Sequence, residues 1–179
     1  MKLSQTLHDE LNLQINRELS SEYAYLAMAA YFESINLDGF TNFFKVQAAE
    51  EHFHAMKIFN FLNAIGGRVK LLQINEPKTD FNNILEVFEL ALHQEEHIEY
   101  CIDRLMDLAI KDNNHAVMSF LKWYVDEQVE EIDLFNKLIA KVKIAGNEGS
   151  AILMIDSELA KRKASPEILS IRTDDGEGE

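Results

Sequence analysis

Glu51 and His54 are the pair of residues in this chain whose types and spacing are best suited to chemistry. They are three residues apart, so on a helix both side chains project from the same face. A carboxylate and an imidazole on an apolar face cost free energy unless a charge or a hydrogen-bonding group meets them there. The rest of this face is apolar, and it carries Phe44, Ala48, Ala55, Ile58, Leu62 and Ile65.

Three further segments offer partners for this pair, because each places polar residues in the middle of an apolar stripe. Glu18 and Glu95 are single carboxylates, and Gln128 and Glu131 form a second pair three residues apart. One such glutamate alone is more often half-exposed than a ligand, so the recurrence on four segments carries the prediction. Several buried carboxylates in one core repel one another and require a multivalent cation. The pattern predicts a two-metal site inside a four-helix bundle, with iron or manganese favoured over magnesium.

Apolar residues recur at helical spacing along four long segments, which must position these side chains. The predicted helices run from about Ser4 to Asn36, from about Gly39 to Ile65, from about Asp80 to the break at 112–114, and from about Asn114 to Ala145. We expect residues 36–39 to supply a turn and an N-cap for the second helix. Gly66 and Gly67 should end that helix, and Thr79 or Asp80 should cap the third.

The segment 67–80 contains Pro77 and lacks helical periodicity, so it predicts a crossover along the length of the bundle. A shorter amphipathic helix is expected from Ser150 to about Lys163. The predicted fold class is all-α, a four-helix bundle with a long crossover between helices 2 and 3 and a short fifth helix. Residues 1–165 form the expected domain, and residues 166–179 are expected to be a flexible acidic tail.

The composition excludes several classes of function. Seventeen basic and 31 acidic residues give a net charge of −14, so we expect no nucleic-acid partner, because phosphate binding needs a basic surface. The longest apolar run, residues 23–32, is shorter than the roughly 17–25 residues that span a bilayer, so no membrane partner is expected. Cys101 is the only cysteine, and the N-terminus lacks a secretory pattern, which favours a cytoplasmic protein.

Three motifs add a family resemblance over residues 7–163. They are Asn-Arg-Glu-Leu-Ser-Ser at 16–21, Ala-Glu-Glu-His-Phe-His at 49–54 and Trp-Tyr-Val-Asp-Glu-Gln-Val-Glu-Glu at 123–131. With these motifs the chain resembles the non-haem bacterial-type ferritins. The resemblance implies a homo-oligomeric cage of about two dozen copies, which oxidises Fe(II) with dioxygen or peroxide at a dinuclear ferroxidase centre and stores the Fe(III) mineral.

The resemblance also implies roles for the polar residues of the stripes. Glu18, Glu51 and His54 match the ligands of the first iron, and Glu51, Glu95 and Glu131 match those of the second, with Glu51 bridging the two. Gln128 matches a glutamine beside the pair, where it can hydrogen-bond to oxygen species or a ligand. Tyr25 matches a tyrosine next to the dinuclear site, although a buried aromatic that only packs in the core would give the same sequence signal.

A second acidic set consists of Glu50, Glu127 and Glu130, each one position from a residue of the predicted centre. One position is about 100° around a helix, so these side chains should face away from the core. In the bacterial ferritins, glutamates like these form a third iron site on the side of the inner cavity. The alternative is a solvated acidic face.

Two alternatives remain within the same superfamily. Haem-binding bacterioferritins have a methionine directly after the bridging glutamate and Glu-x-x-His as their second pair, whereas this chain has His52 and Gln128-x-x-Glu131. No haem is therefore expected. A di-iron oxidase or oxygenase acting on an organic substrate would use the same ligands. The predicted function is iron storage with ferroxidase activity.

Overall fold

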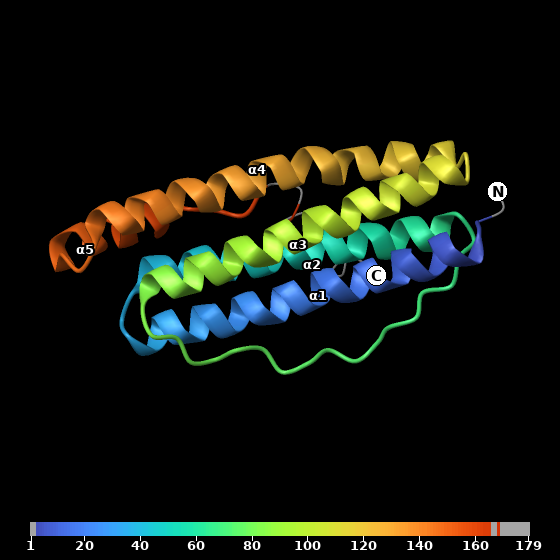
Figure 1. Cartoon of the computed structure of the whole chain (residues 1–179). Coiled ribbons are helices and arrows are strands. Elements are labelled where there is room, and N and C mark those ends of the chain that lie inside the picture. The colour runs from blue at the N-terminus through green and yellow to red at the C-terminus, as the bar shows by residue number, and fades with distance from the viewer. Residues whose placement is uncertain (1–2, 166–167, 169–179) are drawn as a thin grey trace, which may run out of the picture.

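The computed structural model describes residues 3–165 and residue 168, and these residues form five helices and no strand (Figure 1). The helices are α1 (Gln5–Ser34), α2 (Asp38–Ala64), α3 (Ile84–Lys111), α4 (His115–Ala145) and α5 (Gly149–Leu159). The first four are long and make the bundle, which confirms the predicted fold class. The predicted tail lies outside the described residues apart from Ile168, which is buried.

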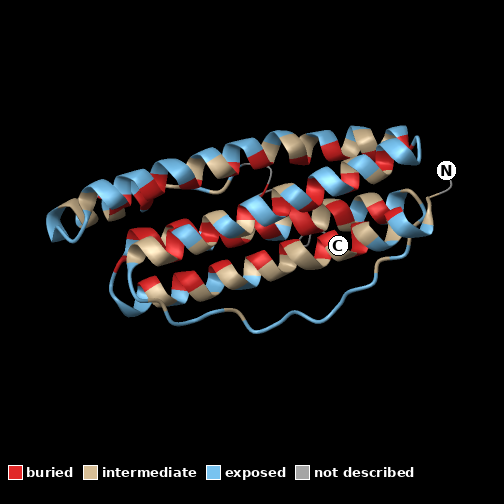
Figure 2. Cartoon of the chain, viewed as in Figure 1, coloured by how far each residue is buried: buried red, intermediate tan, exposed pale blue. Residues whose placement is uncertain are grey.

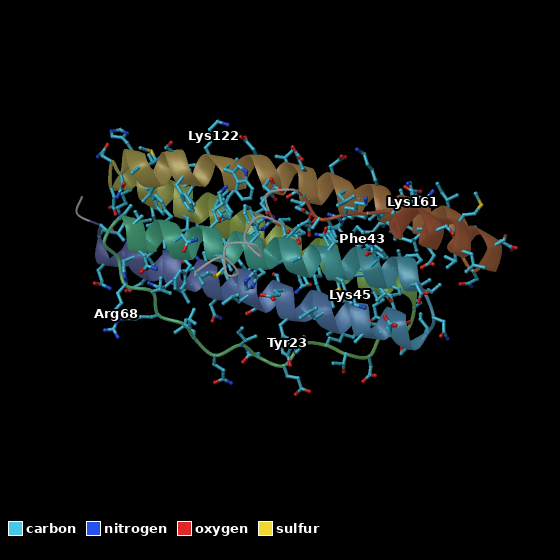
Figure 3. All side chains as sticks on the ribbon, turned by 180° about the vertical axis from the view of Figure 1, so that it is seen from behind. Tyr23, Phe43, Lys45, Arg68, Lys122 and Lys161 are labelled. Atoms are coloured by element: carbon cyan, nitrogen blue, oxygen red, sulfur yellow. The ribbon has the colours of Figure 1, made fainter. Side chains whose placement is uncertain are left out.

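The bundle consists of two helix pairs joined by a crossover. α1 packs against α2, α3 packs against α4, and α1 also contacts α3. The irregular segment 65–83 runs along the outside of α1 from one end of the bundle to the other (Figure 1; Figure 3 labels Arg68 near its start). Asn12 fixes this segment to α1, because its side chain donates to the Arg68 carbonyl at 3.2 Å and accepts from the Lys70 N–H at 2.6 Å. The predicted crossover is thus confirmed.

Three helix ends lie close to their predicted positions, and local residues explain them. The Ser4 side chain caps α1 by accepting from the Leu7 N–H at 3.2 Å. The Asn114 side chain caps α4 by accepting from the Val117 N–H at 3.2 Å. Gly66, with φ +82°, lies directly after the C-cap of α2 in the left-handed region that glycine adopts at no steric cost.

The predicted start of α3 is wrong, because the helix begins at Ile84 and its cap is Asn83, not Thr79 or Asp80. The Asn83 side chain accepts from the Glu86 N–H at 2.9 Å, and the Glu86 carboxylate accepts from the Asn82 N–H at 2.7 Å. This reciprocal arrangement resembles a capping box and satisfies two N–H groups at once. It therefore outcompetes a start four residues earlier. α5 also ends earlier than predicted, at Leu159.

The predicted local cap of α2 is wrong as well, since residues 36–39 make no side-chain cap there. The N–H groups of Gly39 and Phe40 instead donate to Asp156 Oδ1 of α5, at 2.8 and 3.0 Å. A Cβ atom at position 39 would lie 1.7 Å from the Asp156 carbonyl oxygen, so only glycine allows α5 to approach this closely. α5 thus closes the end of α2 and brings the following chain back to the bundle.

The core consists of two apolar clusters on either side of a polar layer. Figure 2 shows the buried residues on the faces that the helices turn toward one another, with the crossover exposed. One cluster is rich in phenylalanine and includes Phe32, Phe40, Phe43, Phe44, Phe88 and Phe135. The other is mainly aliphatic and includes Leu7, Leu11, Ile58, Leu62, Ile102 and Leu121. Along every long helix, the predicted site residues come between the members of these clusters.

Candidate metal centre

All six polar residues of the predicted stripes are buried in the middle of the bundle. Each side chain is at most 5% exposed, and the six come from four helices. α1 supplies one carboxylate, α2 the carboxylate–imidazole pair, α3 one carboxylate, and α4 the amide–carboxylate pair. The set is Glu18, Glu51, His54, Glu95, Gln128 and Glu131.

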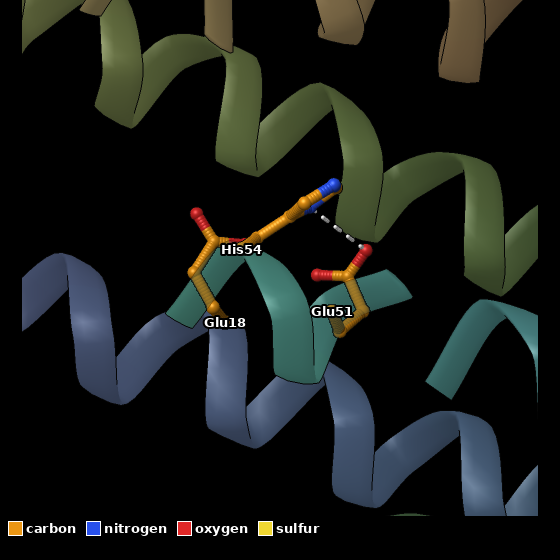
Figure 4. Close-up of side chains that lie close together, drawn as sticks. All are labelled: Glu18, Glu51 and His54. Atoms are coloured by element: carbon orange, nitrogen blue, oxygen red, sulfur yellow. Dashed lines mark ion pairs between the residues drawn. The ribbon is translucent and has the colours of Figure 1, made fainter. Parts of the chain in front are cut away.

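Glu18, Glu51 and His54 form the tightest group. One ligand atom from each of them lies within 4.8 Å of the other two. Figure 4 shows the three side chains facing one another between the helices, with Glu51 Oε1 3.7 Å from His54 Nδ1. Two carboxylates and one imidazole at this spacing form a donor set that suits an iron-like cation.

Hydrogen bonds do not satisfy all carboxylate oxygens of this group. Both oxygens of Glu51 and the Oε2 atom of Glu18 are buried, and no N–H or hydroxyl group in the described part of the chain donates to them. A proton shared between the two carboxyls is the hydrogen bond left to them. Unpaired buried carboxylate oxygens are costly, and native structures rarely keep them. A cation bound between Glu18, Glu51 and His54 would satisfy all three oxygens, so the residues present fit a metal ion.

The carboxylates contributed by α3 and α4 are hydrogen-bonded by neutral donors. The Tyr25 hydroxyl donates to Glu95 Oε1, and Gln128 Nε2 donates to Glu95 Oε2 at 3.1 Å. Gln47 Nε2 donates to Glu131 Oε2 at 2.9 Å. These donors hold Glu95 and Glu131 in fixed positions beside the first group.

Burial shifts the pKa of every ionisable group in the layer toward its neutral form. It raises the pKa of Glu18 to about 7, and burial together with Glu131 raises the pKa of Glu95 to about 8. Burial, with Glu95 and Glu18 nearby, holds the pKa of Glu51 well above its ordinary range, and burial also raises that of Glu131. Burial lowers the pKa of His54 to about 3. Burial in the metal-free layer thus favours protonated carboxyls and a neutral imidazole, and a bound cation would displace those protons.

The sequence and fold of the chain can now be compared with those of known proteins. The family profile described as a ferritin-like domain matches residues 8–145. The chain belongs to the ferritin-like family. It is 39% identical to a bacterial non-heme ferritin of Staphylococcus aureus (strain USA300) over 160 residues, which cover 89% of this chain and 96% of that protein. The corresponding protein of Staphylococcus saprophyticus is 41% identical over the same shares.

A solved structure agrees with this assignment. The open-pore ferritin of the hyperthermophilic archaeon Archaeoglobus fulgidus matches with a TM-score of 0.90 and 40% identity, covering 91% of this chain and all of that one. The predicted family is therefore confirmed at the levels of sequence and fold. In the described part of this ferritin-like chain, no helix is both long and apolar enough to cross a membrane.

Tyr25 both packs in the apolar core and contacts a residue of the polar layer, so both interpretations of this residue apply. Its ring packs in the aromatic cluster, with centroids 5.8 Å from Phe44 and 6.1 Å from Phe135. Its hydroxyl contacts the Glu95 carboxylate, and burial with Glu95 close by raises the pKa of the phenol well above its ordinary value. The tyrosine is therefore a core residue whose hydroxyl reaches the buried carboxylate layer.

Two buried glutamines of the ferritin-like chain were missed from the sequence, Gln14 and Gln47. Gln14 Nε2 donates to Glu18 Oε1 at 2.8 Å, and Gln47 Nε2 donates to Glu131. Each glutamine is four residues before a glutamate of the centre, Glu18 or Glu51, and so lies on the same helix face. A glutamine one turn from a glutamate in an apolar stripe is the signal that could have identified them.

The second acidic set is only partly brought together. Glu50 and Glu127 line a cavity of about 380 Å³ together with His54 of the metal centre. Glu130 is exposed and is not among the residues that line this cavity. Burial raises the pKa of Glu50 to about 7 in spite of a neighbouring cation, Arg162, which opposes the shift. The sequence did not predict this arginine.

Proposed function

We propose that this protein is a ferroxidase of the non-haem ferritin type. As a ferritin it stores iron, and we infer that it oxidises Fe(II) at a dinuclear centre made by Glu18, Glu51, His54, Glu95 and Glu131. The observation that carries the proposal is the buried group of Glu18, Glu51 and His54, in which no N–H or hydroxyl group of the described residues donates to either oxygen of Glu51.

Glu51 is the proposed bridge between two irons. The carboxylates of Glu95, Glu18 and Glu131 all act to raise its pKa, so Glu51 is within electrostatic range of both groups of ligands. No N–H or hydroxyl group of the described residues donates to its two oxygens, and a bridging carboxylate uses one oxygen for each metal. The proposed ligands are Glu18, Glu51 and His54 for one Fe(II), and Glu51, Glu95 and Glu131 for the other.

The charge of this ligand set favours oxidation. Four carboxylates in a low-dielectric layer stabilise Fe(III) more than Fe(II), because each added positive charge relieves their mutual repulsion. Two adjacent Fe(II) ions can together deliver two electrons to one dioxygen or peroxide molecule. Gln128 and Tyr25 donate hydrogen bonds to the proposed ligand Glu95 and so hold its carboxylate in position. The protein thus supplies geometry and charge, and the electrons come from the iron substrate.

A di-iron oxidase acting on an organic substrate is the competing proposal. The cavity next to His54 bears on this choice. Phe53, Trp123 and Ile168 also line it, but its acidic wall residues are the carboxylates Glu50 and Glu127. An acidic wall suits the passage of a cation better than the binding of an apolar substrate. We therefore propose that oxidised iron leaves the centre through this cavity, with Glu50, Glu127 and the nearby Glu130 as a third iron site.

The decisive experiment adds Fe(II) to the purified, metal-free protein in air and then separates the product by size. Storage predicts hundreds of iron atoms retained per assembly, with the broad absorbance of a ferric mineral. A stoichiometry of about two irons per chain without mineral would refute storage and favour the oxidase. Light scattering on the same material tests the proposed cage of about two dozen copies. Cytoplasmic localisation stays a prediction.

A further inference from the structure

The chain after α5 turns back along α2 toward the metal centre. The Asn42 side chain of α2 donates to the carbonyls of Leu159 and Arg162, at 3.0 Å each, and so holds this segment against the helix. Figure 1 shows the segment leaving α5 and passing back toward the middle of the bundle. Ser165 and Ile168 then form part of the wall of the cavity that also contains Glu50 and Glu127.

Arg162 is the residue of this segment that reaches the acidic wall. Its Nη2 atom donates to Glu50 Oε2 at 2.7 Å, and the two side chains are only 20% and 14% exposed. Its guanidinium carbon lies 4.5 Å from the centroid of the Phe43 ring, which fixes the plane of the group. The Nη1 atom is buried and has no hydrogen-bond partner in residues 3–165 and 168. The arginine is thus pinned in place with part of its donor capacity unused.

A cation on this wall has a consequence for any metal ion in the cavity. An ion bound by Glu50 would share its carboxylate with the guanidinium, and the two positive charges would repel each other in partly buried surroundings. Arg162 cannot lose its charge by deprotonation, because its guanidinium stays protonated in proteins. It can only move aside.

We propose that Arg162 is a built-in counter-cation of the cavity, which holds one carboxylate of the exit wall and keeps metal ions there weakly bound. The inference rests on the proposed function, in which iron leaves the dinuclear centre past Glu50 and Glu127. A tightly binding wall would retain the ion, whereas a wall that already carries an arginine passes it on. Arg162 therefore acts on the specificity and speed of transfer and takes no part in the oxidation itself.

The test uses Zn²⁺, which binds like Fe(II) but is not oxidised, and the full-length assembled protein. Calorimetric titration should find tight sites in the dinuclear centre and a weaker class of site in the cavity. Arg162→Gln should strengthen the weaker class by about tenfold or more, the order expected when one unit charge is removed beside a divalent ion. Arg162→Lys, which keeps the charge, should stay close to the wild type. Zinc anomalous scattering should place the strengthened site at Glu50.

Lys161→Gln is the matched control, since it removes the same charge from the exposed neighbouring residue (Figure 3). If Arg162→Gln and Lys161→Gln bind Zn²⁺ equally, the proposal is wrong. It is also wrong if Arg162→Gln and Arg162→Lys only make the segment after α5 more sensitive to protease, because that result would show a purely structural tether. The tight dinuclear sites report separately on the proposed function. If the wild-type protein has no tight class of Zn²⁺ site, the proposed function is refuted, but the affinities of Arg162→Gln and Arg162→Lys for the weaker site can still be compared.

Discussion

The two halves of the proposed metal centre differ in how many neutral donors hydrogen-bond to their carboxylates. The first half consists of Glu18, Glu51 and His54 from α1 and α2. Three of its carboxylate oxygens receive no hydrogen bond from an N–H or hydroxyl group of the described residues. The second half, Glu95, Gln128 and Glu131 from α3 and α4, is hydrogen-bonded by Tyr25, Gln47 and its own glutamine. In the first half only Gln14 donates, to the other oxygen of Glu18 at 2.8 Å, whereas three neutral side chains donate in the second half. The first half is therefore the less satisfied of the two without a cation.

This difference predicts an order of metal binding. A cation entering the first half replaces protons and gains oxygens that had no other partner. A cation entering the second half must also compete with the neutral donors that hold Glu95 and Glu131. We expect the first half to bind more tightly and to fill first, with Glu51 linking the two events.

Replacing Glu51 by Gln should have the largest effect, because it removes a ligand from both halves. We expect fast Fe(II) oxidation to fall by about 100-fold or more, beyond the roughly 10–100-fold loss typical when only a supporting partner of a ligand is removed. Stopped-flow absorbance after aerobic Fe(II) addition measures this rate. Glu96→Gln, an exposed carboxylate on α3, is the control and should oxidise iron normally. Unchanged kinetics in Glu51→Gln would rule out the assigned bridge.

Glu18→Gln and Glu95→Gln should separate the two halves. Glu95→Gln should still bind one Zn²⁺ per chain in the first half, with affinity within about tenfold of the wild type, since the altered residue is a ligand only of the second metal. Glu18→Gln should weaken the tightest site itself. Calorimetry gives both stoichiometry and affinity. Equal losses in the two variants would mean that the halves act as one site and that the proposed order of filling is wrong.

The free energy of unfolding of the metal-free protein should depend on pH if the buried carboxyls are protonated. The pKa values of Glu18 and Glu95 are raised to about 7 and 8, so the folded state holds protons that the unfolded state releases near pH 4.5. The stability they contribute is complete below about pH 4.5 and is lost as pH rises toward 8. The lowered pKa of His54 gives the opposite slope, but only below about pH 6.5. From pH 6.5 to 8 the carboxyls alone should therefore set the trend.

Chemical denaturation of chelator-treated protein at pH 6.5 and pH 8 measures this effect. Stability should be lower at pH 8, and the Glu18→Gln/Glu95→Gln double variant should reduce the difference. Zn²⁺ should reverse the trend, because binding displaces the protons and so becomes tighter as pH rises, by about tenfold per pH unit for each proton released. A metal-free protein that is equally stable at both pH values would contradict the protonated layer.

Much of this centre could be predicted from the sequence because it depends on local helix geometry. Glu51 and His54 share a face by spacing alone, and the apolar stripes fix the mid-helix positions of Glu18, Glu95 and Glu131. The cap of α3 at Asn83 was also readable, since Glu86 stands three residues after it, but the prediction favoured Thr79 or Asp80. These features need no knowledge of how distant segments meet.

The remaining contacts join residues far apart in the chain. Asp156 caps α2 from α5, and Arg162 reaches Glu50 across 112 positions. No pattern near Gly39 or Glu50 indicates which distant residue will arrive there. The family resemblance supplied the ligand roles, but it did not indicate that the wall beside them carries an arginine.

Tyr25→Phe should give the smallest effect. It tests whether one hydrogen bond in the second half of the proposed centre affects the second half alone. The ring would keep its packing against Phe44 and Phe135, and only the hydrogen bond to Glu95 would be lost. We expect about 1 kcal/mol of destabilisation in the metal-free protein. Iron oxidation should slow by about tenfold, since the lost group supports a ligand of the second half. First-half Zn²⁺ affinity should be unchanged, and a loss there would show that Tyr25 serves both halves. An unaltered oxidation rate would reduce the tyrosine to a core residue.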